Sequence, residues 1–124
     1  MHWHFRNDQP IYAQLIDQIT LAVLSGAFPP GERLPGVREL ATQAGVNPNT
    51  MQRAMAQLES TGLIYTQRTA GRFVTDETEI ITAVKERLAQ QRAKEFLRSM
   101  AELGYDKAQV QQLLLDLQTQ EVSK

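Results

Sequence analysis

The sequence GVNPNTMQRAMAQLESTG, residues 45–62, decides the fold of this chain. Four of its apolar residues follow the spacing i, i+3, i+4, i+7, which places them in one buried stripe on a helix: Met51, Ala54, Met55 and Leu58. Asn47 can cap this helix, Pro48 suits its first position, and Gly62 ends it. The helix therefore begins with polar side chains that lie outside the stripe, and core packing does not explain them.

Two more helices are predicted before this one. Residues 10–25 carry apolar side chains at helical spacing, with Asp8 as a candidate N-cap. The following stretch AFPPGERLPG, residues 27–36, is rich in Pro and Gly and predicts an ordered connector without secondary structure of its own. A shorter helix then runs from about residue 36 to 44, and Gly45 ends it.

After the third helix, LIYTQ and RFVTD are rich in β-branched and aromatic residues, and RTAG lies between them, which predicts a two-stranded hairpin. Three short helices followed by a hairpin is the order of a winged helix-turn-helix. In that motif the third helix enters the major groove of DNA and the hairpin, or wing, lies beside the backbone or the minor groove. Residues 1–75 therefore predict a DNA-binding domain in an α+β, mainly α, fold.

Residues 76–124 predict a helical tail, with a long helix at about 76–103 and a short one at about 107–120, each opened by a capping box: Asp76 with Glu79, and Asp106 with Gln109. Two such helices are too few to enclose a drug-sized pocket, so their apolar stripe is expected to form a two-fold dimer interface. The alternative is that this stripe packs back onto the N-terminal domain. The candidate interface residues are Ile81, Val84, Leu88, Phe96, Met100, Val110, Leu113, Leu114 and Leu117.

The polar opening of the third helix suits DNA recognition. Asn and Gln bond bidentately to adenine, Arg bonds to guanine, and Thr bonds to a phosphate oxygen. Four Arg residues fall where the motif meets phosphates, at the start of the second helix, on the third helix and beside the wing turn. Alone, the polar residues also fit a solvated helix face with an Asn cap. The candidate DNA contacts are Arg38, Asn47, Asn49, Thr50, Gln52, Arg53, Arg68 and Arg72.

The charge balance limits how DNA can be bound. The formal net charge is -1 at pH 7, and residues 1–75 hold six Arg and no Lys against five acidic residues. A polyanion must therefore meet a clustered face of the domain and not a bulk positive charge. The near-neutral domain keeps one alternative open, a winged-helix adaptor that binds proteins.

Other function classes find little support. The chain has no Cys and no recognisable set of nucleophile, base and orienting residue, so neither an enzyme nor a cofactor is expected. His2 and His4 could face one side of an N-terminal strand or arm, but two ligands are too few for a metal site. No signal peptide or membrane-spanning run is recognisable, which predicts a cytoplasmic protein that joins the nucleoid when it binds DNA.

The stretches PIYAQLIDQI, SGAFPPGERLPGVRELA and VNPNTMQRAMAQLESTGLIYTQRTAGRFV resemble the N-terminal domain of the GntR family of bacterial transcription regulators. VNPNT followed by GLIYTQR, with a short helical tail, resembles the YtrA subfamily. The resemblance implies a homodimeric regulator, usually a repressor, often of operons for ATP-driven transporters, and it implies DNA contacts at the same eight residues. Three features depart from the family pattern: Gly36 replaces a capping Ser, Pro48 replaces a contacting Arg, and RTAGR replaces a Gly-rich wing tip.

Overall fold

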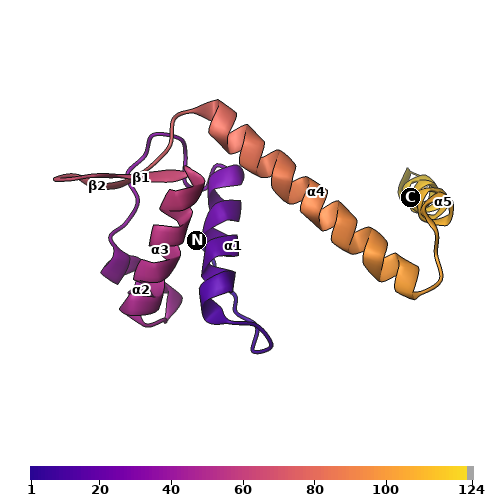
Figure 1. Cartoon of the computed structure of the whole chain (residues 1–124), viewed down its shortest axis with the longest axis horizontal. Coiled ribbons are helices and arrows are strands. Elements are labelled where there is room, and N and C mark those ends of the chain that lie inside the picture. The colour runs from indigo at the N-terminus through magenta and orange to yellow at the C-terminus, as the bar shows by residue number, and fades with distance from the viewer. Residues whose placement is uncertain (123–124) are drawn as a thin grey trace. The chain divides into compact units, whose positions relative to one another are not determined.

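The computed structural model describes residues 1–122, and side chains as far as residue 120. Within that range the elements follow in the order α1 (Ile11–Leu24), α2 (Val37–Ala44), α3 (Pro48–Thr61), β1 (Ile64–Gln67), β2 (Gly71–Val74), α4 (Thr78–Glu102) and α5 (Lys107–Val122) (Figure 1). This order confirms the predicted α+β, mainly α, fold with a winged helix-turn-helix at its N-terminal end.

The first compact unit spans Met1–Lys85. Its core is built by α1, α2, α3 and the hairpin, with α1 and α3 packed side by side (Figure 1). The predicted stripe of α3 is fully enclosed, since Met51, Ala54 and Met55 have no exposed surface. The unit extends past the predicted boundary at residue 75, because Ile81 and Val84 at the start of α4 pack on the same core.

The ends of the central helices follow the sequence. The side-chain oxygen of Asn47 accepts a hydrogen bond from the backbone N–H of Asn49 at 2.7 Å and so caps α3. Gly45 and Gly62 end α2 and α3 with φ of 70° and 85°, a left-handed conformation that a side chain disfavours. These three residues fix the turn between α2 and α3 and the turn into the wing.

Two predicted caps are wrong. Asp8 does not cap α1, whose N-cap is Pro10, because its carboxylate binds the guanidinium of Arg6 at 2.6 Å instead. The carboxylate of Asp76 does not open α4 either; the N–H of Glu77 bonds to the hydroxyl of Thr75 at 3.1 Å. At Asp8 a closer partner, Arg6, competes for the carboxylate that the sequence pattern had assigned to the cap.

The hairpin pairs Ile64 with Val74 and Gln67 with Gly71 in antiparallel register, which leaves residues 68–70 as its turn. We call β1, β2 and this turn the wing. The connector before α2, predicted to have no secondary structure of its own, runs along the free edge of β2. Leu34 N–H donates to the carbonyl of Arg72 at 2.8 Å, and Val74 N–H donates to that of Glu32 at 2.9 Å. The wing is therefore held on both sides of β2.

The N-terminal arm packs on its own unit, where Trp3 and Phe5 lie partly buried against the core. The two rings stack with centroids 6.2 Å apart. Side-chain amides of α1 bond to the backbone of the arm in both directions, Gln18 to His4 and Gln14 to Arg6. Each side-chain amide thus makes the backbone hydrogen bonds that a neighbouring strand would otherwise make, and the arm is bound to α1 without forming a sheet.

The second compact unit begins at Glu86 and contains the rest of α4 with α5. Here the predicted capping box is confirmed: Asp106 N–H donates to Gln109 at 2.9 Å, and Gln109 N–H donates to Asp106 at 2.8 Å. Val110 is buried between the two helices, whereas several larger apolar side chains are left exposed: Phe96, Leu103, Leu114, Leu115 and Leu117. The unit therefore buries only part of its apolar surface by itself.

No helix within residues 1–122 is both long and apolar enough to cross a bilayer.

Candidate nucleic-acid interface

The exposed face of α3 carries the predicted recognition residues. Asn49, Gln52 and Arg53 are exposed, and Thr50 is half-buried at the first turn. The opposite face of the helix is locked into the core by Met51 and Met55. Since the core holds that face, the polar face of α3 is presented outward as one surface, in the place that the winged helix-turn-helix motif uses for the major groove.

Asn47 combines two features at the N-terminus of α3. Its side-chain oxygen is used by the cap bond to Asn49, while its amide nitrogen has no partner among residues 1–122. An amide nitrogen in this position can donate to a phosphate oxygen or to a base acceptor. Capping and DNA contact are therefore compatible in this one side chain, because they use different atoms.

Arg53 is fixed by a residue that sequence reasoning missed. Its guanidinium carbon lies 4.7 Å from the centroid of the Tyr12 ring, which belongs to α1. A cation over an aromatic face is held there by the ring quadrupole, while the edge N–H groups of the guanidinium remain free to donate. The spacing of residues in the sequence places Tyr12 on the apolar face of α1. Only the packing of α1 against α3 shows that its ring contacts Arg53.

Arg72 is held differently. Its Nε donates to Glu59 Oε1 at 2.6 Å, and the hydroxyl of Thr66 donates to the same carboxylate. The hydrogen bond from Thr66 and the charge of Arg72 lower the pKa of Glu59 below its ordinary value of 4.5, against the opposing effect of burial. This contact ties the wing to the C-terminal end of α3, so part of the Arg72 guanidinium is used inside the protein.

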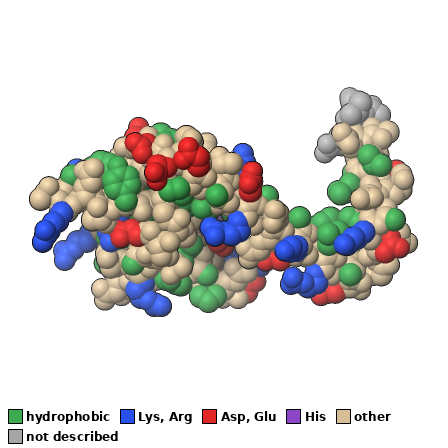
Figure 2. All heavy atoms as spheres, turned by 45° about the horizontal axis from the view of Figure 1, so that its top comes forward, with side chains coloured by type: hydrophobic (Ala, Val, Ile, Leu, Met, Phe, Trp, Pro, Cys, Tyr) green, Lys and Arg blue, Asp and Glu red, His purple; other side chains and the backbone are tan. Residues whose placement is uncertain are grey.

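The remaining predicted cations are free of acids. Among the described residues, Arg38 at the start of α2 and Arg68 at the wing turn are exposed and take part in no salt bridge. Figure 2 shows Lys and Arg side chains gathered on the side of the first unit that carries the wing. The structure thus brings all eight predicted residues into one unit, on α2, α3 with its N-cap, and the wing. A local cluster of cations replaces the bulk charge that the domain lacks.

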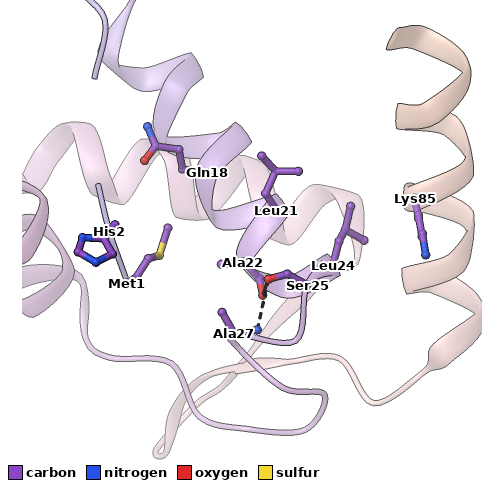
Figure 3. A pocket seen from close by; sticks show the side chains of 9 residues that line it. All are labelled: Met1, His2, Gln18, Leu21, Ala22, Leu24, Ser25, Ala27 and Lys85. Atoms are coloured by element: carbon purple, nitrogen blue, oxygen red, sulfur yellow. Dashed lines mark hydrogen bonds between the residues drawn. The ribbon is translucent and has the colours of Figure 1, made fainter. Parts of the chain in front are cut away.

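A second concavity of the first unit lies elsewhere. It has a volume of about 600 Å³ and mainly apolar walls, which come from the N-terminal arm, α1, the turn after α1 and Lys85 of α4 (Figure 3). It includes no residue of α2, α3 or the wing. This concavity is therefore separate from the candidate interface. No cluster of three or more metal-ligating side chains occurs among the residues described.

Comparisons with known proteins agree with this geometry. The family model "Bacterial regulatory proteins, gntR family" matches residues 11–74. Two regulators of Bacillus subtilis are similar to this chain. The uncharacterised HTH-type transcriptional regulator YhcF is 38% identical over 86% of this chain and 88% of its own length. The HTH-type transcriptional repressor YtrA is 40% identical over 68% of this chain and 70% of its own.

Two solved structures extend the comparison. A GntR family transcriptional regulator from Listeria monocytogenes superposes with a TM-score of 0.83 at 36% identity, over 90% of this chain and 98% of its own. The DNA-binding domain of AraR in complex with operator ORX1 superposes with a TM-score of 0.55 at 30% identity, over 60% of this chain and 96% of its own. The first match includes the helical tail, whereas the second is confined to part of the chain.

Proposed function

Because this chain belongs to the GntR family of bacterial regulatory proteins, which are DNA-binding transcriptional regulators and not enzymes, we propose that it is a homodimeric repressor of an inverted-repeat operator. In this proposal α3 reads base edges in the major groove, and the wing and the start of α2 bind phosphates. The observation that carries it is the outward polar face of α3, with Arg38 and Arg68 exposed on the elements beside it and, in the part of the chain that the structure describes, unpaired with acids.

The eight residues divide by role in this proposal. Asn49, Gln52 and Arg53 project from the first turns of α3, where side chains reach base edges. Asn47 and Thr50 lie at the helix N-terminus, whose N–H groups and dipole favour a phosphate. Three Arg residues flank this helix and supply phosphate contacts that fix the register on DNA: Arg38, Arg68 and Arg72.

The proposed dimer uses the second unit. Leu114, Leu115 and Leu117 on α5 are about half exposed, and Phe96 on α4 is 41% exposed. Phe96 and Leu114 also line an apolar hollow of about 230 Å³ between the two helices. Exposed apolar surface of this extent is typical of an interface, and a second copy of the same unit would cover it.

Not all predicted interface residues support the dimer equally. Val84 is buried in the core of the first unit, where Ile81 also packs, and Val110 is buried within the second unit. These three side chains are used by their own chain. Leu88, Met100 and Leu113 are half-buried. The dimer proposal therefore rests first on Phe96, Leu114 and Leu117.

Selection of bound duplexes from a random library, with the purified protein, tests the proposal. A dimeric repressor of this kind should recover an inverted repeat with half-sites about ten base pairs apart, because two recognition helices then enter successive major grooves. Recovery of no motif, even at low salt, would contradict it and favour an adaptor. We also propose that the recovered motif lies upstream of an operon for an ATP-driven transporter, as the subfamily resemblance implies. The protein would then act in the cytoplasm, where the chromosome lies.

A further inference from the structure

A cleft of about 190 Å³ lies between the wing and the N-terminus of α2. We call it the wing cleft; three Arg residues line it: Arg33 from the connector, and Arg68 and Arg72 from the wing. None of its lining residues is acidic. Its volume is below the roughly 300 Å³ at which pockets begin to hold drug-sized ligands. The cleft therefore suits a small anionic group and not an organic effector.

Arg33 is not among the residues that the sequence indicated as DNA contacts. It lies opposite Phe73 in the short antiparallel pairing between the connector and β2. Phe73 in turn lies two residues after Gly71 on the same strand. Since side chains two residues apart share one face of a strand, Arg33 and Gly71 lie on the same face of the wing. Arg33 is exposed and, within the described residues, forms no salt bridge.

Gly71 makes room for the Arg33 guanidinium. A Cβ atom at Gly71 would lie 3.1 Å from Nε of Arg33, which is tighter than most real Cβ contacts, and 3.5 Å from Nη2, which is an ordinary contact distance. Gly71 also has φ of 102°, which side chains rarely adopt. The guanidinium thus rests against the bare backbone of the wing. This contact limits where the guanidinium can lie, and no carboxylate of the described side chains forms a salt bridge with it.

The opposite wall of the cleft also lacks a partner for its donors. The N-terminus of α2 begins at Gly36 and has no side-chain cap, which leaves the N–H groups of its first turn open toward an acceptor. Val37, the first residue of α2, lines the cleft. A guanidinium on one wall and uncapped helix N–H groups on the other form a complementary pair for a tetrahedral anion.

We propose that the wing cleft binds one phosphate of the DNA backbone in each half-site, and that Arg33 is the residue that holds it. This inference rests on the proposed function, since the phosphate belongs to bound DNA. It assigns to the connector, and not only to α3 and the wing turn, a share of the DNA contact. Arg33 would position the wing on the duplex, because the same guanidinium touches both the phosphate and Gly71.

The first test is the salt dependence of binding to a short mixed-sequence duplex. Each phosphate contact contributes about 0.9 to the slope of log K against log salt concentration, so Arg33→Ala should reduce the slope by about 1.8 in a dimer. Arg33→Lys should restore most of the slope, because Lys retains the charge. Arg92→Ala is the matched control: Arg92 is exposed on α4 in the second unit, and its loss should leave the slope unchanged.

The second test identifies the phosphate. Single backbone positions of the selected operator are replaced by uncharged methylphosphonate, and affinity is measured for the wild type and for Arg33→Ala. The wild type should be weakened at one position in each half-site at which the variant is insensitive. If both proteins are sensitive at the same set of positions, or if Arg33→Ala keeps the wild-type slope, the Arg33 contact is refuted while DNA binding stands. A wild type that binds no duplex would refute both.

Discussion

The guanidinium of Arg53 on α3 lies over the ring of Tyr12 on α1, with 4.7 Å between the guanidinium carbon and the ring centroid. This contact joins the recognition helix to the helix that supports it. A long Arg side chain loses conformational freedom when it binds DNA, and a side chain already held by a ring loses less. Tyr12 should therefore influence DNA affinity without touching DNA.

Arg53→Ala should weaken operator binding by about 1 to 3 kcal/mol. If Arg53 reads a base, the loss is confined to the operator and one operator position becomes relaxed; if it binds a phosphate, all sequences weaken alike. Titration of the selected operator and of a mixed-sequence duplex distinguishes the two roles.

Tyr12→Leu should weaken operator binding less, by about 0.5 to 1 kcal/mol, because it removes the support of Arg53 and keeps the contact. The double variant should then be no weaker than Arg53→Ala alone, since both changes act through one side chain. Additive losses would show that Tyr12 acts on DNA independently of Arg53. Thermal unfolding of each variant checks that the helix pair remains packed.

The contact between Glu59 and Arg72 predicts a dependence of stability on pH. Bonds from Thr66 and Arg72 lower the pKa of Glu59, so the folded state favours the charged carboxylate more than the unfolded state does. This stabilisation is fully present above the ordinary pKa of 4.5 and is lost as the pH falls through the lowered pKa of the folded state. Because the pair is partly exposed, it should contribute no more than about 1 kcal/mol.

Glu59→Gln should accordingly unfold at lower denaturant concentration than the wild type at neutral pH, and the difference should shrink in the acid range below pH 4.5. Urea unfolding at a series of pH values measures it. A difference that stays constant as the acid range is entered would mean that Glu59 acts through packing and not through its charge.

Much of this arrangement could be predicted from the sequence because local signals and the global fold agree. The stripe from Met51 to Leu58, the cap at Asn47 and the glycines at positions 45 and 62 each specify α3 by a short-range rule, and the structure confirms them. The order of elements and the family resemblance follow from similar local signals in the neighbouring stretches, and both are confirmed.

The features that could not be predicted depend mainly on contacts between segments that are distant in the sequence. Tyr12 and Arg53 are brought together only by the packing of α1 on α3, and Arg33 reaches Gly71 only because the connector pairs with β2. The wrong cap at Asp8 has the same origin on a smaller scale, since Arg6 competes for its carboxylate. Periodicity and capping rules describe one segment at a time, and they do not show which side chains meet across elements.

The dimer proposal predicts that Leu114→Glu converts the protein to monomers in sedimentation experiments. Leu114 is 49% exposed, so its change should disturb the fold of the single chain little, whereas Leu113 is partly buried and is a poorer choice. Gln112→Glu introduces a carboxylate two residues away, which is roughly 200° around the helix, and should leave the dimer intact. If Leu114→Glu still sediments as the wild-type dimer, the interface does not involve this part of α5.

Variants of Asn47 can distinguish its effect on stability from its effect on DNA binding, because the cap and the proposed DNA contact use different atoms of the side chain. Asn, Asp and Ser are comparable N-caps, so Asn47→Asp and Asn47→Ser should each stay within about 0.5 kcal/mol of the wild-type free energy of unfolding, whereas Asn47→Ala should lose about 1 kcal/mol. The Asp variant differs in placing a carboxylate where the interface should meet a phosphate.

Asn47→Asp should therefore weaken DNA binding at least tenfold, about 1.4 kcal/mol, while Asn47→Ser, the uncharged control with the same cap, should weaken it much less. Chemical unfolding and duplex titration of the same preparations give both quantities. A stable Asn47→Asp that binds DNA as tightly as the wild type would mean that the N-terminus of α3 lies away from the phosphates. The uncapped N-terminus of α2 would then remain as a helix start that can meet a phosphate, and the reading of base edges by the first turns of α3 would have to be abandoned.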